Sequence, residues 1–245
     1  MAKEANAPGP RLLLEATAIV VSILLAFAID AAWQEHQERG FEREALQGLL
    51  EEHQGHQEAL AGHRELNLAV RRAVADLITA CRQGAFPSGE PGLDVAMWLL
   101  RIPATADLGG GVRIALISSG RLEALSSREL RFRLAGWQRV MDEVADDEAQ
   151  GVRVVHDLVL PYLTRQGVPL PIYPSIEAAR ANVPSPEGGV LTSDPAAAQR
   201  VFADPEFLSI LEARYDGLAH TTSELDALIA ANEAILGAIH ASLGE

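Results

Sequence analysis

The chain has 245 residues, a net charge of −14 and a single cysteine. This acidic balance argues against nucleic acid as a partner, because binding phosphate needs a basic surface. With Cys81 alone, an intrachain disulfide and a zinc site of the multi-cysteine kind are both excluded.

Residues 12–33, LLLEATAIVVSILLAFAIDAAW, are strongly apolar and contain only two ionisable side chains, Glu15 and Asp30. At about 1.5 Å per residue, a helix of this length covers roughly 33 Å, enough to cross the hydrocarbon core of a bilayer. We therefore expect a short N-terminal tail (residues 1–11), a transmembrane helix (residues 12–33) and one helical domain behind it (residues 34–245).

A cleaved signal peptide is the alternative interpretation of this N-terminus. Lys3 and Arg11 precede the apolar run, and Ala26 and Ala28 have the spacing of a cleavage site. The apolar run is long for a signal peptide, and helix-favouring sequence continues past the site. An uncleaved anchor is therefore favoured.

One face of the apolar helix has the composition of a helix-packing surface. At about 100° per residue, its members fall within roughly a third of the circumference. They are Glu15, Ala18, Ser22, Ala26, Asp30 and Trp33. Ala18, Ser22 and Ala26 form a ridge of small residues that allows another helix to approach closely. We expect another membrane protein, or a second copy of this chain, to pack there, with Glu15 and Asp30 reaching the headgroups.

The charges beside the apolar helix leave its orientation open. Lys3 and Arg11 lie on one side and Arg39 and Arg43 on the other. The two sides have equal numbers of basic residues, so the positive-inside rule does not decide the orientation. Large downstream domains cross the membrane largely regardless of charge. We expect a single-pass protein of the cell inner membrane, with its domain in the periplasm.

The distribution of proline predicts three long helices, since proline is excluded from helix interiors. Proline is absent from residues 11–86, 104–160 and 206–245. The first and last of these runs repeat side chains at 3-4 spacing, as long amphipathic helices do. No run has the period of a strand. The predicted fold is all-α, with the transmembrane helix continuing into an elongated antiparallel bundle of three long helices and short connecting helices.

Residues 93–101 and 112–118 are the predicted connecting helices, with a short strand as the less favoured alternative for the second, and Gly120 is the expected C-cap there. The next long helix is expected to start at Ser126 or Ser127, with Glu129 as its capping-box acid.

That helix is expected to end at Pro161, and residues 164–193, rich in proline and glycine, are predicted to be a mobile loop. Asp194 and Asp204, each followed by proline, are expected to cap the last two helices.

The first and last long helices are expected to pair antiparallel. Alignments that let buried polar residues find partners are favoured, since a lone one costs about 1–3 kcal/mol. The preferred register pairs Leu60 with Leu225, His53 with Asn232 and His63 with Thr222.

Two segments resemble a bacterial family of uncharacterised single-span membrane proteins. The first is Glu15, an apolar run, Leu25-Ala26-Phe27-x-Ile29-Asp30 and Trp33. The second is Ser119-Gly120-Arg121-Leu122-x-x-Leu125, Glu129-Leu130-Arg131 and Leu134-x-x-Trp137. The resemblance spans about residues 12–160 and implies an anchored helical domain in a bacterial membrane, with no implied activity.

His53, His56 and His63 are the candidate metal ligands, because imidazole binds zinc, copper or nickel. His53 and His56 share a helix face, but His63 lies about two turns beyond His56, so the three cannot meet on one ion. We expect them instead to be partly buried polar layers, and we expect no cofactor.

A basic segment stands out in this acidic chain, and it is a candidate surface for an anion or an acidic partner. Its members are Arg113, Arg121, Arg128, Arg131, Arg133 and Arg139. Pairing with the glutamates of the protein itself is the alternative.

The sequence favours a membrane-anchored, non-enzymatic interaction or structural protein, such as an accessory subunit of a membrane complex or a homo-oligomer. One alternative is an extracytoplasmic sensory or ligand-binding bundle that signals through a partner. Another is a proton-coupled membrane component that uses Glu15 and Asp30.

Overall fold

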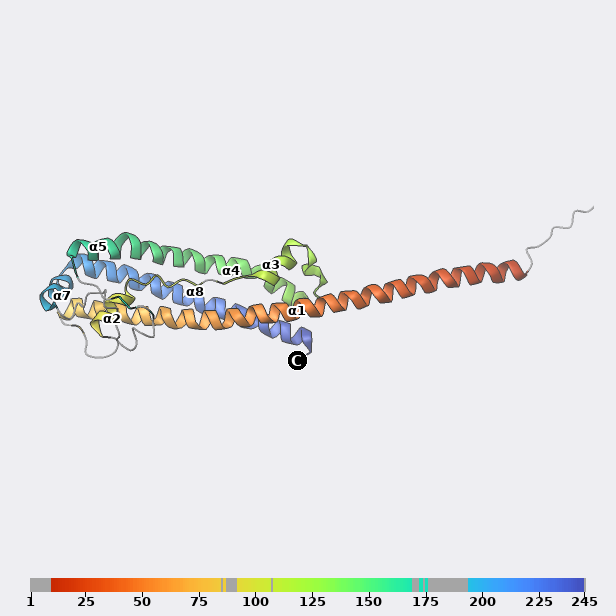
Figure 1. Ribbon diagram of the computed structural model, residues 1–245, viewed down its shortest axis with the longest axis horizontal. Coiled ribbons are helices and arrows are strands. Elements are labelled where there is room, and N and C mark those ends of the chain that lie inside the picture. Colours follow the sequence, from red (N-terminus) through yellow and green to blue (C-terminus); the bar gives the residue numbers. More distant parts are fainter. Residues whose placement is uncertain are drawn as a thin grey trace, which may run out of the picture.

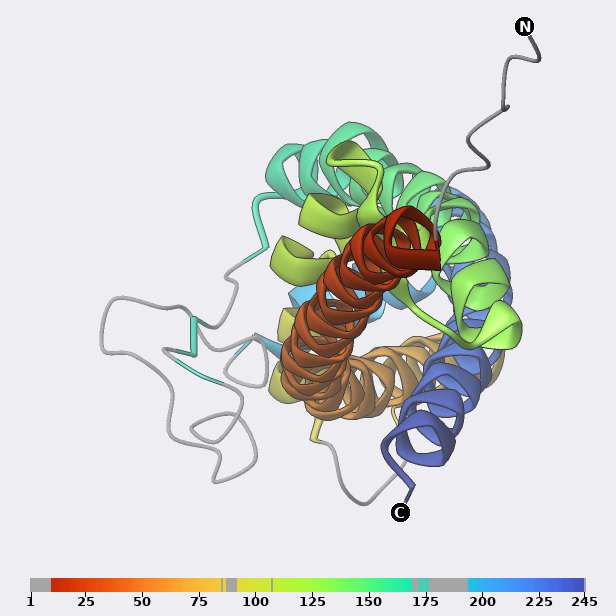
Figure 2. The ribbon, with the colours of Figure 1, turned by 90° about the vertical axis from the view of Figure 1, so that its right-hand side faces the viewer.

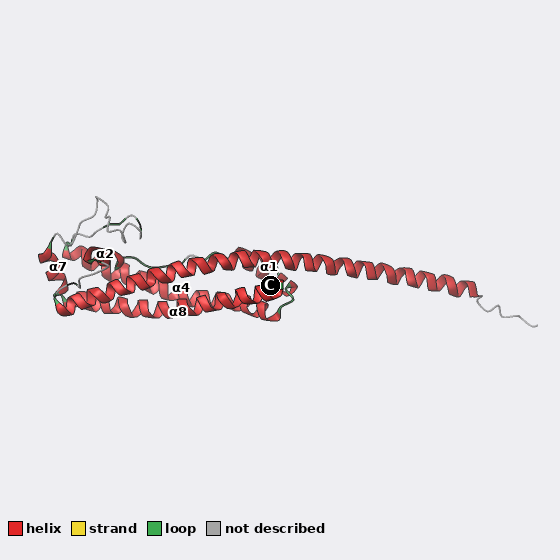
Figure 3. Cartoon of the chain, turned by 90° about the horizontal axis from the view of Figure 1, so that it is seen from below, coloured by secondary structure: helices red, strands yellow, loops and turns green. Residues whose placement is uncertain are grey.

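The structure is a computed structural model that describes residues 10–84, 86, 92–106, 108–168, 172–173, 175 and 194–244; of residues 10–14 and 16 it describes only the backbone. Within these ranges every regular element is a helix, which confirms the predicted all-α class (Figure 3). The elements are α1 (Pro10–Gln83), α2 (Leu93–Leu99), α3 (Gly111–Ser118), the 3-10 turn η1 (Arg121–Ala124), α4 (Arg128–Arg153), the π-helical η2 (Val154–Val159), α5 (Leu160–Gln166), α7 (Pro195–Phe202) and α8 (Pro205–Leu243).

α1 is one uninterrupted helix of 74 residues that joins the apolar N-terminal stretch to the rest of the chain. Its first part extends alone, and α8 ends close to the point where α1 meets the other helices (Figure 1). A window of 18 residues near its N-terminus has a mean hydropathy of 1.8 and is not buried at all. By length and composition, this is the one candidate membrane span among the described residues.

α8 runs antiparallel to α1 along much of its length, as polar contacts at three levels show. Arg82 Nη2 lies 2.9 Å from Glu212 Oε1, and Arg64 Nε lies 2.5 Å from Asp226 Oδ1. Farther along, His53 Nδ1 lies 2.7 Å from Asn232 Oδ1. As the residue number falls on α1 it rises on α8, which is the mark of an antiparallel pair.

The predicted register is confirmed at one polar layer and wrong at the other. His53 meets Asn232 as expected, and Leu60 and Leu225 are both fully buried in one core cluster. Thr222, however, donates to Asn67 Oδ1 at 3.1 Å rather than meeting His63. The reason is that His63 faces α4 and contacts a carboxylate there.

The apolar core consists of two clusters. One gathers around Leu49, Leu60, Trp137 and Leu225, on the side of the candidate span. The other, at the far end, contains Leu77, Met97, Tyr162 and Phe207, among others, and includes residues of α2 and α7. Burying each such side chain stabilises the fold by about 1.5–3 kcal/mol. Viewed from the end at which α1 extends, α4 and α8 lie beside α1, so that the three long segments surround a common centre (Figure 2).

Side-chain caps fix where three of the helices begin. Asp194 accepts from Ala197 N at 2.9 Å and Asp204 from Glu206 N at 2.9 Å, which confirms both predicted caps. Ser127 caps α4 by accepting from Leu130 N at 3.2 Å. The predicted capping-box role of Glu129 is wrong, because Glu129 is one residue too early and pairs with an arginine instead.

The second long helix does not end at Pro161, as predicted, but continues to Gln166. A proline lacks an N–H and its ring clashes with the carbonyl four residues before it. The six π-helical residues of η2 directly precede α5 and widen the turn there, so that Pro161 falls in the first turn of α5. The helix ends at Gly167, whose φ of 60° is left-handed. Of the predicted loop, residues 169–171, 174 and 176–193 lie outside the described residues.

A buried arginine ties α8 to the end of α4. Arg214 Nη2 donates to Ile102 O at 2.8 Å and Nη1 to Gly151 O at 3.3 Å. Only 3% of Arg214 is exposed, so its guanidinium cannot swing into solvent. A Cβ on Gly151 would lie 2.9 Å from Nη1, closer than real Cβ contacts. Alanine at this position would therefore push the guanidinium away from its acceptor.

We expect Gly151→Ala to lower the free energy of unfolding by about 1–3 kcal/mol, because it displaces a buried guanidinium from its acceptor. The control is Gly217→Ala on α8, where nothing lies within 4 Å of the added Cβ. There the same change should raise the stability by up to about 1 kcal/mol, through helix propensity alone. Urea unfolding of both variants makes the comparison; equal effects would contradict the role given to Gly151.

Candidate functional site

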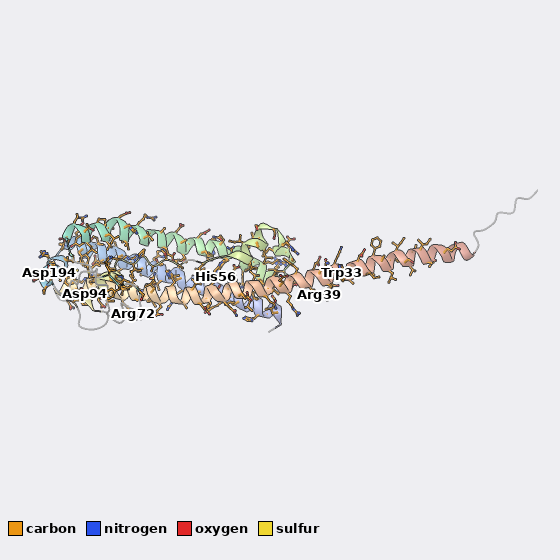
Figure 4. The ribbon with its side chains drawn as sticks, in the orientation of Figure 1. Trp33, Arg39, His56, Arg72, Asp94 and Asp194 are labelled. Carbon is orange, nitrogen blue, oxygen red and sulfur yellow. The ribbon has the colours of Figure 1, made fainter. Side chains whose placement is uncertain are left out.

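The predicted packing face of the apolar helix has no contact with the rest of the domain. Ala18, Ser22, Ala26, Asp30 and Trp33 are all exposed. The Ser22 hydroxyl donates to Ala18 O at 2.8 Å, so the helix satisfies it internally. Trp33 lies on the free part of α1, whereas His56 lies where α1 runs alongside the other helices (Figure 4). The face is therefore available to another chain.

The interior contains a polar layer centred on His53, which is fully buried. Nδ2 of Asn232 donates to His53 O at 3.0 Å and to Gln57 Oε1 at 2.8 Å. Asn232 Oδ1 is therefore the acceptor that faces His53, and His53 Nδ1 must carry a proton. Burial is the largest influence on this imidazole and lowers its pKa below the ordinary 6.5, while the hydrogen bond to Asn232 acts in the opposite direction.

Three aromatic rings pack together in this layer. His56 stacks on Trp137 with centroids 5.8 Å apart, and His53 meets the same indole edge-on at 5.3 Å. His56 Nε2 lies 2.5 Å from Gly109 O, so this nitrogen is the donor. Within the described part of the chain, His53 Nε2, His56 Nδ1 and Trp137 Nε1 are buried without a hydrogen-bond partner. The rings are thus held by one hydrogen bond per histidine and by packing.

Two further carboxylates, Glu148 and Glu52, connect the long helices to the chain between α2 and α3. His63 Nε2 lies 2.8 Å from Glu148 Oε1 on α4, and both side chains are buried. The same oxygen accepts from Ala106 N at 3.0 Å. Glu52 Oε2 accepts from Val112 N at 2.6 Å, at the start of α3. Each carboxylate thus accepts a hydrogen bond from a backbone N–H, that of Ala106 or that of Val112. These bonds attach the chain between α2 and α3, and the start of α3, to the long helices.

This geometry argues against a metal site. Among the described residues, no group of three or more histidine, cysteine, aspartate or glutamate side chains is placed to hold an ion. One nitrogen each of His53 and His56 is engaged by a neutral acceptor, and His63 turns to Glu148. The histidines therefore form polar layers within the fold.

The predicted arginine surface is divided among different environments, and Arg113 does not belong to it. Arg113 is 3% exposed and donates to Gln138 Oε1 at 2.8 Å. Arg121 lies over the ring of Phe41, 3.4 Å from its centroid. Arg131 donates to the carbonyls of Leu125 and Ser126.

Two further arginines of this segment pair along their own helix, as the alternative anticipated. Arg133 lies 2.6 Å from Glu129, and Arg139 lies 2.5 Å from Glu143. Arg128 is exposed at the first turn of α4.

Arg214 and Glu148 are the interior charges that the sequence analysis missed. Burial lowers the pKa of Arg214 to about 10, and its two carbonyl acceptors are on different segments. Tyr215, the neighbouring residue, fits the 3-4 spacing of α8 but is only half-buried. The burial of Arg214 follows from the end of α4 and the Ile102 segment, which no pattern on α8 reveals.

Surface hollows lie in the grooves between the helices and are lined by side chains that pair with one another. A hollow of about 480 Å³ between α1 and α8 is flanked by the Arg82–Glu212 pair. A smaller one of about 260 Å³ between α4 and α8 is flanked by Asp147 and His220, whose Oδ2 and Nδ1 are 3.1 Å apart.

Comparisons of this chain with protein-family models, with curated proteins and with solved structures found no match. The resemblance to single-span bacterial membrane proteins stays a prediction from the motifs that carry it.

We expect the stability of the domain to fall with pH below about 6.5 in a way that depends on His53. Because its pKa is lower in the folded chain than the ordinary 6.5, the unfolded chain takes up the proton first as the pH falls. The contribution of neutral His53 is therefore complete above about pH 6.5 and is lost progressively toward its folded pKa.

The variant His53→Asn retains an N–H for Asn232 and removes the titration. Its unfolding free energy should change less than that of the parent chain between about pH 7.5 and about pH 5. His156→Asn, at an exposed position of η2, is the matched control and should keep the parent slope. Parallel slopes for the parent and His53→Asn would contradict the assignment.

Proposed function

We propose that this chain is a membrane-anchored, non-enzymatic protein that acts through contacts with another membrane protein or with copies of itself. One observation carries the proposal: no described side chain in the apolar window of α1 is buried against the rest of the chain. Ile19, Leu24 and Phe27 are 61%, 62% and 67% exposed. Contiguous apolar surface of this extent is unstable in water and stable in hydrocarbon.

In this proposal the three long helical segments form an elongated antiparallel bundle that α1 attaches to the bilayer. The continuity of α1 supports this arrangement, since its one proline, Pro10, is at the first position of the helix and does not interrupt it. The anchor and the domain would then move as one body. A partner that binds either of them would act on both.

The interior supports a structural role for the polar residues. His53 is bonded to Asn232, Glu148 to a backbone amide and Arg214 to two carbonyls. Side chains that are engaged in this way hold elements together.

We place the protein in the inner membrane of a bacterium, with the domain in the periplasm. The resemblance described above supports the bacterial membrane. The size of the domain supports its translocation, because large segments cross largely regardless of flanking charge.

The anchor predicts that the chain stays with membranes after alkaline extraction. Replacing Ile23 and Phe27 with arginine should release it, because each charge at the centre of a span costs about 2.5–3.5 kcal/mol. Arginine at the exposed positions Gln54 and Glu58 of the same helix is the matched control and should leave the chain in the pellet.

Cysteine labelling in whole cells tests on which side of the inner membrane the domain lies. Burial raises the pKa of the Cys81 thiol to about 11, so the natural cysteine should react slowly. A cysteine introduced at exposed Ser223 should be labelled by a membrane-impermeant maleimide once the outer membrane is permeable. Labelling only after lysis of the inner membrane would place the domain in the cytoplasm.

If the apolar helix binds a partner protein or a second copy, that protein should co-purify with the chain from detergent-solubilised membranes. Ser22→Ile and Ala26→Ile should remove it, because bulky side chains hold the two backbones apart. The matched control is Ile19→Leu on the opposite face. Unchanged co-purification after crowding the ridge would exclude this packing face.

A further inference from the structure

A hollow of about 420 Å³ lies at the end of the domain that faces the apolar stretch of α1. One stripe of α1 lines it, with residues at the spacing i, i+3, i+4 and i+7 that belongs to a single helix face. These residues are His36, Arg39, Gly40 and Arg43. Ser126, just before α4, and Ser242, near the end of α8, line it as well. Figure 4 shows Arg39 at the point where α1 leaves the other helices.

Gly40 leaves the hollow open beside two arginines. Nothing lies within 4 Å of a Cβ added at this position. Arg39 and Arg43 are both exposed, and Arg43 forms no ion pair with any residue that the structure describes. Within the described lining Glu42 is the one carboxylate, and its Oε1 accepts from Ser126 N at 2.6 Å. The lining therefore has a net positive charge, although the net charge of the whole chain is −14.

The arginines of this stripe are directed toward the apolar end of α1. A helical side chain leans back over the turn that precedes its own Cα, and the turns that precede this stripe belong to the apolar stretch. Arg39 shows this direction, because its Nη2 donates to Glu35 Oε1, one turn earlier. The same lean carries Arg43 over the turn that contains Gly40.

Both guanidinium groups reach the level of the lipid headgroups if residues 12–33 span the bilayer. At about 1.5 Å per residue, the Cα atoms of Arg39 and Arg43 lie roughly 9 Å and 15 Å beyond Trp33. A lean of one turn, about 5.4 Å, brings the charged groups to roughly 4 Å and 10 Å. The headgroup layer is about 5–8 Å thick on each side of the hydrocarbon. One arginine therefore lies within this layer and the other at its outer edge.

We propose that this hollow binds the phosphate of an anionic phospholipid from the bilayer that holds the anchor. The inference rests on the proposed function, because only an anchored chain keeps the hollow at the headgroups. Guanidinium binds phosphate through two parallel N–H···O bonds, and arginines beside a span attract anionic lipids. The Ser126 hydroxyl at the rim provides a further donor.

The pair between Arg39 and Glu35 does not compete strongly with a phosphate. Their side chains are 72% and 63% exposed, and an ion pair so open to water contributes little to stability. A lipid phosphate can therefore replace the carboxylate at small cost. Arg43 needs no such exchange.

Native mass spectrometry of the full chain in detergent tests the lipid directly. When phosphatidylglycerol and phosphatidylcholine are offered in equal amounts, the chain should retain phosphatidylglycerol, because the arginines repel the choline ammonium. Replacing Arg39 and Arg43 with glutamine should weaken that binding about 30-fold, from about 5-fold per arginine near a membrane surface. Replacing Arg139 and Arg200, which are exposed on α4 and α7, removes the same charge and should leave the binding unchanged.

Filling the hollow provides the second test, with both arginines kept. Gly40→Trp adds a side chain where the chain has space, so its melting temperature should not fall, but the phosphatidylglycerol should be lost. Gly62→Trp, on the same helix with equally open surroundings, should retain the lipid.

Equal retention of the two lipids by the parent chain would overturn the proposal, and so would phosphatidylglycerol that survives either Gly40→Trp or the double glutamine variant. Lipid that is removed by a wash with inorganic phosphate, but not by sodium chloride of equal ionic strength, would make free phosphate the occupant. Alkaline extraction separates these failures from a failure of the proposed function. A chain that stays in the membrane without preferring phosphatidylglycerol refutes the lipid site alone, whereas a chain released from the membrane refutes the anchor.

Discussion

The hydrogen bonds between His53 and Asn232 fix how α1 and α8 lie against each other, and the rest of the domain depends on that alignment. Both side chains are fully buried, and the amide reaches both the imidazole and the backbone of His53. A slip of one turn would leave both groups without partners, at about 1–3 kcal/mol each, while leucines would find new neighbours at little cost. With the observed alignment, Asn67 meets Thr222, and His63 can face Glu148 on α4. The polar layers select one packing, and the two apolar clusters stabilise it.

Helix caps and other features that depend on neighbouring residues in the sequence could be predicted. Features that depend on contact with a helix elsewhere in the chain could not. Asp194 and Asp204 each precede a proline, and a cap needs only its own first turn. Pro161 was assigned to a helix end by the same local reasoning, but η2 accommodates it within a longer helix. The tie from Arg214 to Gly151, three residues before the start of η2, joins α8 to this region. No pattern within the second helix contains that contact.

In the candidate site, too, some contacts could be predicted from helix spacing and others could not. His53 and Asn232 could be paired because each lies in the 3-4 spacing of its own helix, and matching two such patterns gives few registers. Glu148 could not be found, because spacing along α4 does not reveal how that helix is rotated against α1. Arg113 was grouped with a surface by the composition of its segment. Its burial follows from the short helix α3, which Glu52 fixes at its first turn and which turns the guanidinium toward Gln138.

Under the proposed anchoring, the height of each surface above the membrane follows from the continuity of α1. From Trp33 to Glu42 a helix rises roughly 14 Å, at about 1.5 Å per residue. Glu42 Oε1 accepts from Ser126 N at 2.6 Å, which places the residues just before α4 at that level. Under the proposed anchoring, the start of α4 is therefore at a height that the anchor determines and that is equal in every copy. Chains anchored in this way would need only to diffuse and rotate in the plane of the bilayer to meet a partner in the same membrane. Such confinement raises the effective concentration of two surfaces without any added contact. A small contact surface can thus be sufficient for two anchored proteins, where the same surface on a dissolved domain would be too weak.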